Sequence, residues 1–419
     1  MAKAWIVTAD MGYGHQRAAY PLRDIAIRII NSNKDNNLTV KEKRLWNYAK
    51  GFYETISRFS DIPVFGRPLF RLYDKLQRIA PFYPFKDRSA PSMGARLLAR
   101  MASKGFLAGI ILYMKSDPRP LVATIFFPAI VANHHSIPSI YCVVTDSDIN
   151  RIWVPVNPKE SKIIYFIPAE RTRARLLQYG VLEEKIVLTG FPLPKELTGR
   201  NDSIAKKILA IRLPLLDPNR RFLKYHSSII SKELKHPLRK RKRPMMISFM
   251  IGGAGAQSRS ARLFLKSISP YVKKKEYNIS IIVGTHMALR EEFLKLSKEL
   301  GVEEGVRIVY GLSKLEYFKE CSRALEDTDV IITKPSEMIF YAALGIPIFM
   351  LPPIGAHERS NRDYIIELGC GLDIHNIRSF HYRLSDLKNN GTLARMAWNG
   401  YTNMIRHGTY EIERIIRKA

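Results

Sequence analysis

Short apolar runs alternate along the chain with longer segments in which apolar positions recur at helical spacing. In the first half we expect strands at residues 4–9, 121–127, 139–145, 162–167 and 185–188, and helices at 16–30 and 170–180. The second half repeats the plan, with strands at 246–251, 279–284, 306–309, 329–332 and 348–351 and helices at 258–271, 288–300, 312–321, from 336 onward and within 393–417. Buried strands that alternate with helices are typical of a parallel sheet covered on both faces, so the pattern predicts an α/β protein.

The length of 419 residues exceeds what one hydrophobic core usually supports, so we expect two domains. We predict an N-terminal domain at 1–195, a basic interdomain connection at 196–244 and a C-terminal domain at 245–391. Helices at 392–419 close the chain, with the option that they pack back on the N-terminal domain. The cysteines Cys142, Cys321 and Cys370 fit neither a metal motif nor a disulfide framework, which indicates a reducing cytoplasm.

The formal net charge of +29 is the unusual bulk property. Nucleic acid, an anionic membrane and anionic small ligands would each explain it, as would a general excess of solvated lysines. Residues 46–85, within a segment 46–110, interleave aromatic side chains with Lys and Arg. This pattern indicates either inward-packed helices or a surface that dips into a membrane interface. Residues 219–243 hold ten Lys or Arg and one acid, which favours a solvated connection or attraction to anionic lipid over a nucleic-acid patch.

Two glycine-rich turns each follow a predicted strand and precede a predicted helix. Gly12 and Gly14 make the first turn, and Gly252, Gly253 and Gly255 make the second. Glycine lets backbone approach a ligand closely, and a helix that begins there points N–H groups and a partial positive charge at an anion. A tight turn without a ligand is the alternative. Two such turns at the starts of two similar halves predict paired Rossmann-like domains that face a shared cleft.

The turns belong to a set of motifs that occur in one order along nearly the whole chain. The set comprises residues 11–19, 143–146, 188–192, 252–256, 331–335, 345–347 and 352–361. In these motifs the chain resembles the GT-B glycosyltransferases of the group that contains MurG, monogalactosyldiacylglycerol synthase and the processive diacylglycerol glucosyltransferases. The resemblance implies two Rossmann-like parallel-sheet domains that face an interdomain cleft. It also implies a UDP-sugar co-substrate bound mainly by the C-terminal domain, an acceptor approaching from the N-terminal domain, and no cofactor or metal.

The second half carries candidate donor-binding residues after two strand ends. Lys334 would offset phosphate charge, Thr333 or Ser336 would cap a helix, and Glu337 would accept hydrogen bonds from ribose hydroxyls. The alternative for Glu337 is a carboxylate favoured only by the helix dipole. The resembled group often has Gly-Gly after Lys-Pro and a ribose-binding Glu deeper in the helix, so Glu337 is not at the matching position.

A further set of polar residues follows the next strand end, at His357, Glu358 and Asn361. Because the resemblance places the sugar near this strand end, we expect these side chains to hydrogen-bond sugar hydroxyls. A solvated loop is the alternative.

His15 follows the first glycine turn, on the acceptor side. Transfer to a hydroxyl needs a base, and imidazole is suited to that role near neutral pH; orientation of the donor phosphate and a purely structural role are the alternatives. Asp146, at the end of a parallel strand, is the rival base. Asp146-Ser147-Asp148 also mimics the metal-binding Asp-x-Asp of the other main glycosyltransferase fold. The layout with two glycine turns argues against that fold.

The resemblance and the residues together predict an inverting hexosyltransferase that is associated with the cytoplasmic face of the membrane. It would move a hexose or N-acetylhexosamine from a UDP-sugar to a lipid or lipid-linked acceptor. One alternative is a GT-B-shaped nucleotide-sugar 2-epimerase, which needs no membrane surface. A non-catalytic nucleic-acid-binding protein is suggested by charge alone.

Overall fold

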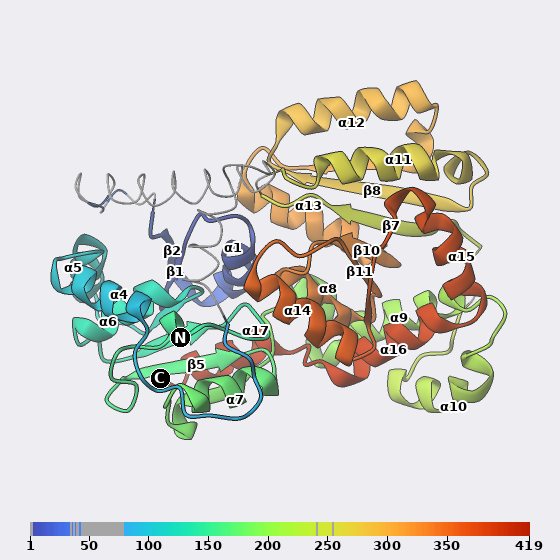
Figure 1. Ribbon diagram of the computed structural model, residues 1–419. Helices are drawn as coiled ribbons and strands as arrows, with labels where there is room; N and C mark the ends of the chain where they lie inside the picture. Colours follow the sequence, from blue (N-terminus) through green and yellow to red (C-terminus); the bar gives the residue numbers. More distant parts are fainter. Residues whose placement is uncertain are drawn as a thin grey trace. The chain divides into compact units, whose positions relative to one another are not determined.

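The computed structural model describes residues 3–33, 36, 38, 42, 79–239, 242–253 and 255–419. The chain divides into two compact units. The first comprises Met1–Pro192, Ile354–Ser360 and Gly408–Ala419, and the second comprises Leu193–Pro353 and Asn361–His407. Figure 1 colours both along the sequence, so the first unit holds the blue-to-green elements together with the last red helix.

The described part of the first unit contains a parallel sheet of six strands in the order β2-β1-β3-β4-β5-β6. The strands are β1 (Ala4–Thr8), β2 (Ala26–Asn31), β3 (Leu121–Ala123), β4 (Ile140–Val143), β5 (Ile163–Ile167) and β6 (Ile186–Leu188). The helices are α1 (Gly14–Ala19), α4 (Met93–Ser103), α5 (Ala108–Lys115), α6 (Phe126–His134), α7 (Glu170–Gln178) and α17 (Gly408–Ile416). Short 3-10 helices are η1 (Tyr20–Ile25), η2 (Arg151–Trp153) and η3 (Glu183–Lys185).

Residues of β1 enter two different cores because strand side chains alternate between the faces of a sheet. Trp5 and Val7 join a core formed with residues of α4, α5 and α6. Ala4 and Ile6 face the other way and join a core that includes Ile412 of α17. The last helix of the chain therefore packs with its first strand.

The structure corrects the helix predicted at residues 16–30. α1 gives way to η1, where Pro21 stands in the first turn, and the chain then forms β2 beside β1. Pro21 has no amide hydrogen to continue a helical ladder, and β-branched residues such as Ile29 and Ile30 favour a strand. The strand predicted at 121–127 is also shorter than expected, since α6 begins at Phe126.

The described part of the second unit contains a second six-stranded parallel sheet, in the order β12-β11-β10-β7-β8-β9. Its strands are β7 (Met245–Met250), β8 (Tyr277–Gly284), β9 (Val306–Tyr310), β10 (Val330–Thr333), β11 (Ile348–Met350) and β12 (Gly371–Asp373). Its helices are α8 (Lys195–Thr198), α9 (Ser203–Leu216), α10 (Leu223–Leu234), α11 (Ser258–Lys273), α12 (Met287–Leu300), α13 (Lys314–Glu326), α15 (Phe380–Asn389) and α16 (Thr392–Asn403). Its 3-10 helices are η4 (Arg200–Asp202), η5 (Glu303–Gly305), η6 (Glu337–Leu344) and η7 (Ile377–Ser379).

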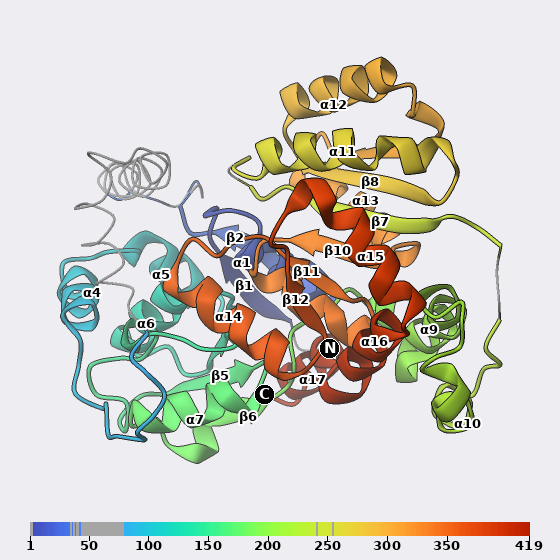
Figure 2. The same ribbon diagram turned by 45° about the vertical axis from the view of Figure 1, so that its right-hand side comes forward.

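Helices cover both faces of this second sheet, as a doubly wound fold requires. α11 and α12 lie along one face and α13 lies on the other (Figures 1 and 2). The helix α14 (Ala356–Glu367) follows β11 and begins in the stretch that groups with the first unit.

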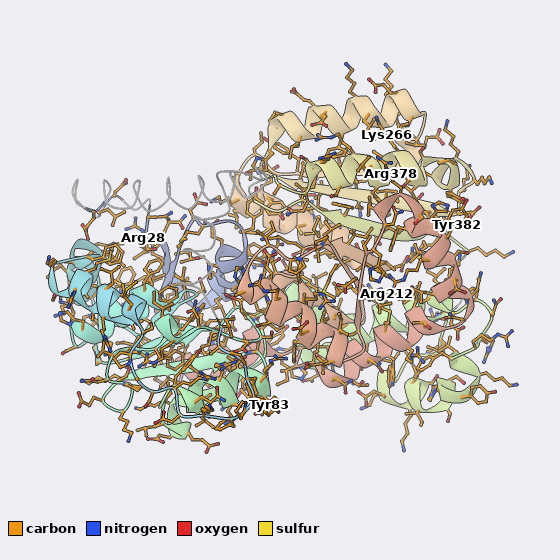
Figure 3. All side chains as sticks on the ribbon, in the orientation of Figure 1. Arg28, Tyr83, Arg212, Lys266, Arg378 and Tyr382 are labelled. Carbon is orange, nitrogen blue, oxygen red and sulfur yellow. The ribbon has the colours of Figure 1, made fainter. Side chains whose placement is uncertain are left out.

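Residues 196–244, predicted as a basic connection, fold into helices of the second unit. Leu209 and Leu213 of α9 and Ile230 of α10 are buried in its core. Arg212, labelled in Figure 3, is buried and donates to the carbonyls of Thr328, Leu344 and Gly345 at 2.8–3.2 Å. Burial lowers the pKa of the Arg212 guanidinium to about 10.

Candidate functional site

The second sheet brings two predicted donor-binding residues together at one point of its edge. β7 lies between β8 and β10, so the strand order turns at β7, and ligands of open α/β sheets bind at such a point beyond the carboxyl ends of the strands. Gly252 follows β7 and Lys334 follows β10. A Cβ atom built on Gly252 would lie 3.6 Å from Cε of Lys334. Residues 82 positions apart in the sequence therefore share one small space.

The second glycine turn is partly occupied by its own side chain and backbone. The amide of Gly252 donates to Oε1 of Gln257 at 3.0 Å, and the amide of Gly255, where φ is +72°, donates to the carbonyl of Gly252 at 2.8 Å. Two of the amides predicted to face an anion are thus already hydrogen-bonded. Gln257 must move before the Gly252 amide can meet a phosphate oxygen. Gln257 is not among the site residues predicted above, although it immediately precedes α11.

His286 is a second residue that sequence analysis missed. It follows β8, and its Nε2 lies 2.8 Å from the carbonyl oxygen of Gly253. A carbonyl only accepts, so Nε2 carries the proton and holds the turn in place. The signal was present, because His286 comes two residues after Gly284, the end of a predicted strand at the same sheet edge.

The residues after β10 contribute less to helix capping than expected. Thr333 is the buried last residue of β10. Ser336 stands at the N-cap of η6, but its side chain makes no capping hydrogen bond, which corrects that expectation. Glu337 is the first residue of η6 and is half-buried. Lys334, Ser336 and Glu337 are therefore the donor candidates of this segment that are at least partly accessible.

Two of the three residues predicted after β11, Glu358 and Asn361, form hydrogen bonds with backbone groups in this structure. Asn361 is fully buried, and its Nδ2 donates to the carbonyl of Pro335 at 3.2 Å. Glu358 is also buried, and its Oε2 accepts from the amide of Ile354 at 2.9 Å. His357 is half-buried in the first turn of α14. Asn361 thereby fixes the segment that carries Lys334, which is a different role from the sugar contact predicted for it.

In the first sheet, His15 lies where three strand ends meet. Gly12, with φ at +88°, and Gly14 lead from β1 into α1, and His15 is the second residue of that helix. Nδ1 of His15 lies 2.8 Å from the carbonyl oxygen of Thr124, after β3, and 3.4 Å from Oγ1 of Thr145, after β4. Because the carbonyl only accepts, Nδ1 carries the proton and Nε2 is the basic nitrogen. The neutral ring is thus held in the tautomer that a general base needs.

Asp146, the rival base, follows the next strand end. It is half-buried, and the hydroxyl of Thr172 on α7 donates to the carbonyls of Asp146 and Ser147 at 3.5 and 2.8 Å. The loop that carries Asp146 is therefore tied to α7 through its backbone.

Asp148 has a structural role that excludes it from a metal-binding Asp-x-Asp pair. Both of its oxygens accept from the buried Arg175, at 2.7 and 2.8 Å, and Oδ1 also accepts from the amide of Ile149. Burial opposes the charge of Arg175, but its hydrogen bonds to Asp148 and the negative charge of that carboxylate outweigh burial and raise the pKa of the guanidinium. Among the described residues, no group of three or more His, Cys, Asp or Glu side chains is arranged to hold a metal ion.

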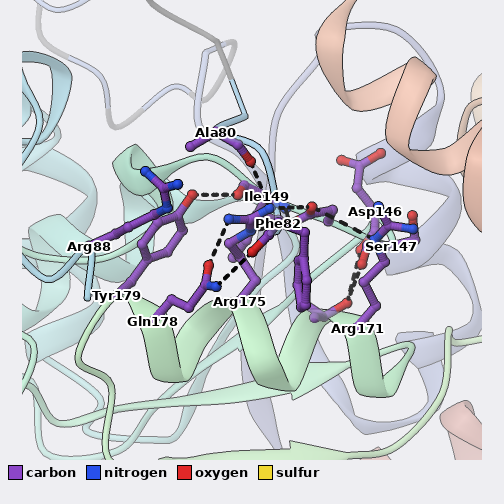
Figure 4. Close-up of polar contacts among 12 residues, drawn as sticks. Ala80, Phe82, Arg88, Asp146, Ser147, Ile149, Arg171, Arg175, Gln178 and Tyr179 are labelled. Atoms are coloured by element: carbon purple, nitrogen blue, oxygen red, sulfur yellow. Dashed lines mark hydrogen bonds and ion pairs between the residues drawn. The ribbon is translucent and has the colours of Figure 1, made fainter. Parts of the chain in front are cut away.

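Two side chains of α7, Arg175 and Gln178, also bind residues 80–82 near the end of the aromatic segment. Arg175 also donates to the carbonyl of Ala80 at 2.9 Å, and Gln178 donates to the carbonyl of Phe82 at 3.3 Å (Figure 4). The Phe82 ring lies 4.9 Å from the Arg175 guanidinium. The loop of Asp146 and residues 80–82 are thus fastened to one helix, α7.

Some predicted features lie outside the described residues. They are residues 46–78 of the predicted 46–110 segment, Lys240 and Arg241 of the basic run, and Ala254 of the second glycine turn.

Sequence comparison supports the resemblance drawn from the motifs. No family model matches the chain. The processive diacylglycerol beta-glucosyltransferase of Bacillus pumilus is 21% identical over 386 residues, which cover 89% of this chain and 83% of that protein. The protein of the same name from Bacillus cytotoxicus is 24% identical over 243 residues, covering 57% of this chain and 50% of that protein. The predicted resemblance to diacylglycerol glucosyltransferases is confirmed.

A solved structure shares the fold. The S. aureus MnaA-UDP co-structure aligns with 100% of this chain and 96% of its own, at a TM-score of 0.52 and 11% sequence identity. At that identity the likeness concerns the fold alone. With two parallel six-stranded sheets flanked by helices, the chain has the two Rossmann-like domains of a GT-B protein, as predicted.

Proposed function

We propose that this protein is a hexosyltransferase that moves a hexose or N-acetylhexosamine from a UDP-sugar to a lipid or lipid-linked acceptor, with inversion at the sugar. The proposal places it at the cytoplasmic face of the membrane. It is supported by the ordered motifs and by the names of the curated relatives, which act on diacylglycerol. The GT-B fold is compatible with it and with other reactions of nucleotide sugars.

The observation that carries the proposal is the approach of Gly252 to Lys334 at the turning point of the second sheet. A diphosphate at this point would meet the backbone of the glycine turn and the ammonium group of Lys334. When the bond between the anomeric carbon and the diphosphate breaks, both groups would stabilise the charge on the leaving oxygen. The side chain of Gln257 would leave the Gly252 amide as the nucleotide enters.

His15 would supply the base. The acceptor hydroxyl oxygen forms a bond to the anomeric carbon, its proton passes to Nε2 of His15, and the bonding electron pair of the leaving group departs with UDP. The hydrogen bond from Nδ1 to Thr124 supports this role because it fixes the tautomer in which Nε2 accepts. Asp146 remains the second candidate for the same proton.

A surface of the first unit supports the membrane part of the proposal. On α4, Met93 and Leu97 are 68% and 56% exposed, and Arg96 and Arg100 beside them are exposed cations. Leu112 on α5 is 66% exposed. Apolar side chains set among cations suit a bilayer interface with anionic lipid. Tyr83, which Figure 3 labels beside α7, and Phe85 are exposed aromatic side chains elsewhere on the first unit.

These helices are also part of the folded domain. In the part of the chain that the structure describes, no single helix is long and apolar enough to cross a bilayer. Helices α4 and α5 reach that length and apolar composition only together, and the angle between them is 61°. Residues of both helices, such as Leu98 and Ile111, pack into the core of the first unit.

The decisive experiment combines binding and transfer. A panel of nucleotide sugars is first screened by thermal shift, because a ligand of the native state raises its apparent stability. The sugar that stabilises the protein is then incubated with vesicles that contain diacylglycerol, and the lipid products are identified. Formation of a glycosylated lipid supports the proposal. An epimerised or free sugar produced without acceptor would establish the 2-epimerase alternative instead. Absence of any nucleotide-sugar binding, together with tight and steeply salt-dependent binding of duplex DNA, would overturn both.

A further inference from the structure

α10 in the second unit presents apolar side chains on the face opposite to its packed face. Leu223, Ile230 and Leu234 are buried against the rest of the unit. Tyr225 and Ile229, one helical turn apart, are 74% and 65% exposed. Their spacing of four residues places both on one face of the helix. The exposed face is therefore apolar at its centre, and both side chains lie largely outside the packing of the described residues of that unit.

Cations surround this apolar pair. Lys232 lies on the same face, seven residues after Tyr225, and the Nζ atom of Lys224 lies 5.6 Å from the centre of the Tyr225 ring. Arg221, just before the helix, and Lys235, just after it, are exposed as well. The only acid of α10, Glu233, is bound by Lys206 and Tyr401 at 3.5 and 3.4 Å.

The basic segment predicted from the sequence exposes fewer cations than its composition suggests. Arg243 does not contribute a loose surface charge, because it forms two hydrogen bonds of 2.6 and 2.8 Å to the buried carboxylate of Asp329. Exposed cations of this region lie on α10 and directly beside it, and also at Arg239 and Lys242 farther along the chain. We call Arg221, Lys224, Tyr225, Ile229 and Lys232 the α10 face.

We infer that the α10 face is a membrane-contact surface of the second unit that binds anionic lipid. Cations meet anionic headgroups, and the tyrosine and isoleucine reach the level at which headgroups give way to acyl chains. An isoleucine at the centre of the patch favours lipid over nucleic acid, because it offers no ring for base stacking and no hydrogen bond to a base edge. This inference rests on the proposed membrane location, and it adds a contact separate from α4 and α5.

Vesicle binding by the whole protein tests the inference without any enzymatic assay. The variant R221Q/K224Q/K232Q removes three cations from the α10 face. Because each cation near an anionic surface contributes roughly fivefold to binding, we expect about 100-fold weaker binding to vesicles of phosphatidylglycerol and phosphatidylcholine. The variant Y225S/I229S should bind those vesicles about tenfold more weakly, through loss of apolar contact.

Two matched controls remove the same groups elsewhere in the second unit. K295Q/K298Q/K319Q takes three exposed cations from α12 and α13, and L312S/L315S takes two leucines that are 76% and 65% exposed. We expect both controls to bind within about twofold of the unmodified protein, since surface substitutions away from a binding site have small effects. Equal losses in control and α10 variants would overturn the inference but leave the membrane location standing. Failure of the unmodified protein to bind anionic vesicles would overturn both.

A labelling experiment reports whether the face touches the bilayer. Cys142, Cys321 and Cys370 are all buried, so a cysteine introduced on the surface can be labelled selectively. Ile229→Cys carrying an environment-sensitive fluorophore should shift its emission to the blue when anionic vesicles are added, whereas Leu315→Cys should not. An unchanged spectrum at residue 229 with bound vesicles, or a shift caused by duplex DNA alone, would refute lipid contact there.

Discussion

His15 and Thr124 are joined by a 2.8 Å hydrogen bond between the imidazole Nδ1 and a main-chain carbonyl, across 109 positions of sequence. A carbonyl group just after β3 thus determines which ring nitrogen of His15, on α1, carries the proton. Because the acceptor is backbone, no substitution at residue 124 that keeps the fold removes it. The relationship makes His15 a ring of fixed orientation and fixed tautomer, which is what proton abstraction by Nε2 requires.

His15→Ala should reduce kcat by on the order of 100-fold or more if the imidazole is the base. Steady-state transfer kinetics measure the effect, and UDP affinity should stay unchanged because the residue belongs to the first unit. Asp146→Asn is the comparison variant. A near-normal kcat in the alanine variant, together with a large loss in the asparagine variant, would reassign the base to Asp146.

Gly252→Val should weaken UDP binding at least about tenfold while the fold survives. Among the described residues, the atoms nearest to a Cβ at this position are ends of flexible side chains, Oε1 of Gln257 at 3.0 Å and Cε of Lys334 at 3.6 Å, so these neighbours can give way. The added methyl groups would nevertheless fill the space assigned to the diphosphate. Calorimetric titration with UDP measures the loss, and a melting temperature near that of the unmodified protein shows that the fold is intact. Unchanged affinity would move the donor site away from this turn.

Asp148→Asn should lower the free energy of unfolding by about 3–5 kcal/mol, because it leaves the buried guanidinium of Arg175 without its counter-charge. Asp117→Asn is the matched control: its partner Arg119 lies 2.8 Å away, but both side chains are more than a third exposed. For that surface pair we expect at most about 1 kcal/mol. Denaturant titration of both variants compares them, and similar losses would contradict the structural role given to Asp148.

Acid should remove the stabilising contribution of Asp202. Burial raises the pKa of this carboxyl, but hydrogen bonds from His407 and Arg406 outweigh it and hold the pKa below its usual 3.8. A carboxyl with a lowered folded-state pKa stabilises fully above its unfolded-state value, and that contribution fades as the pH falls through the lowered value. The difference in unfolding free energy between the protein and Asp202→Asn should thus shrink below about pH 4. Asparagine tolerates the left-handed backbone at this position, where φ is +60°. A difference that stays constant from pH 6 to pH 2 would contradict the assignment.

Much of the fold was predictable because the signals were local. β-branched apolar runs marked strands of both sheets, and the glycine turns at Gly12 and Gly252 marked the first strand-to-helix joint of each sheet. The prediction of a helix at 16–30 was wrong because apolar residues recur there at helical spacing, whereas Pro21 interrupts the helical hydrogen bonds. The packed helices within 196–244 were not predicted because surface cations dominate the composition of this segment. Its buried leucines are spread over α9 and α10 and form no continuous apolar run.

The site was less predictable because its contacts join distant parts of the chain. Gln257 closes onto the Gly252 amide, and His286 holds the Gly253 carbonyl, through turns whose shape depends on the neighbouring strands. Asp148 stands in an Asp-x-Asp pattern, and only the structure shows that Arg175, 27 residues later, binds both of its carboxylate oxygens. Residue type suggested what each group can do, and only the tertiary contacts decided which partner it has.

α17 gives the first unit an unusual dependence on the order of synthesis. Gly408 packs so tightly on the backbone of Gly190 and Phe191 that a Cβ atom there would approach Phe191 O to 2.4 Å, and Ile412 and Ile416 complete the core around Ala4 and Ile6. The core on this face of β1, which also contains Leu22 and Ile25 of η1, therefore stays incomplete until residues 408–416 have emerged from the ribosome. A nascent chain stalled before residue 408 should expose apolar surface in its N-terminal domain and depend on chaperones, although nearly all of that domain has already been made.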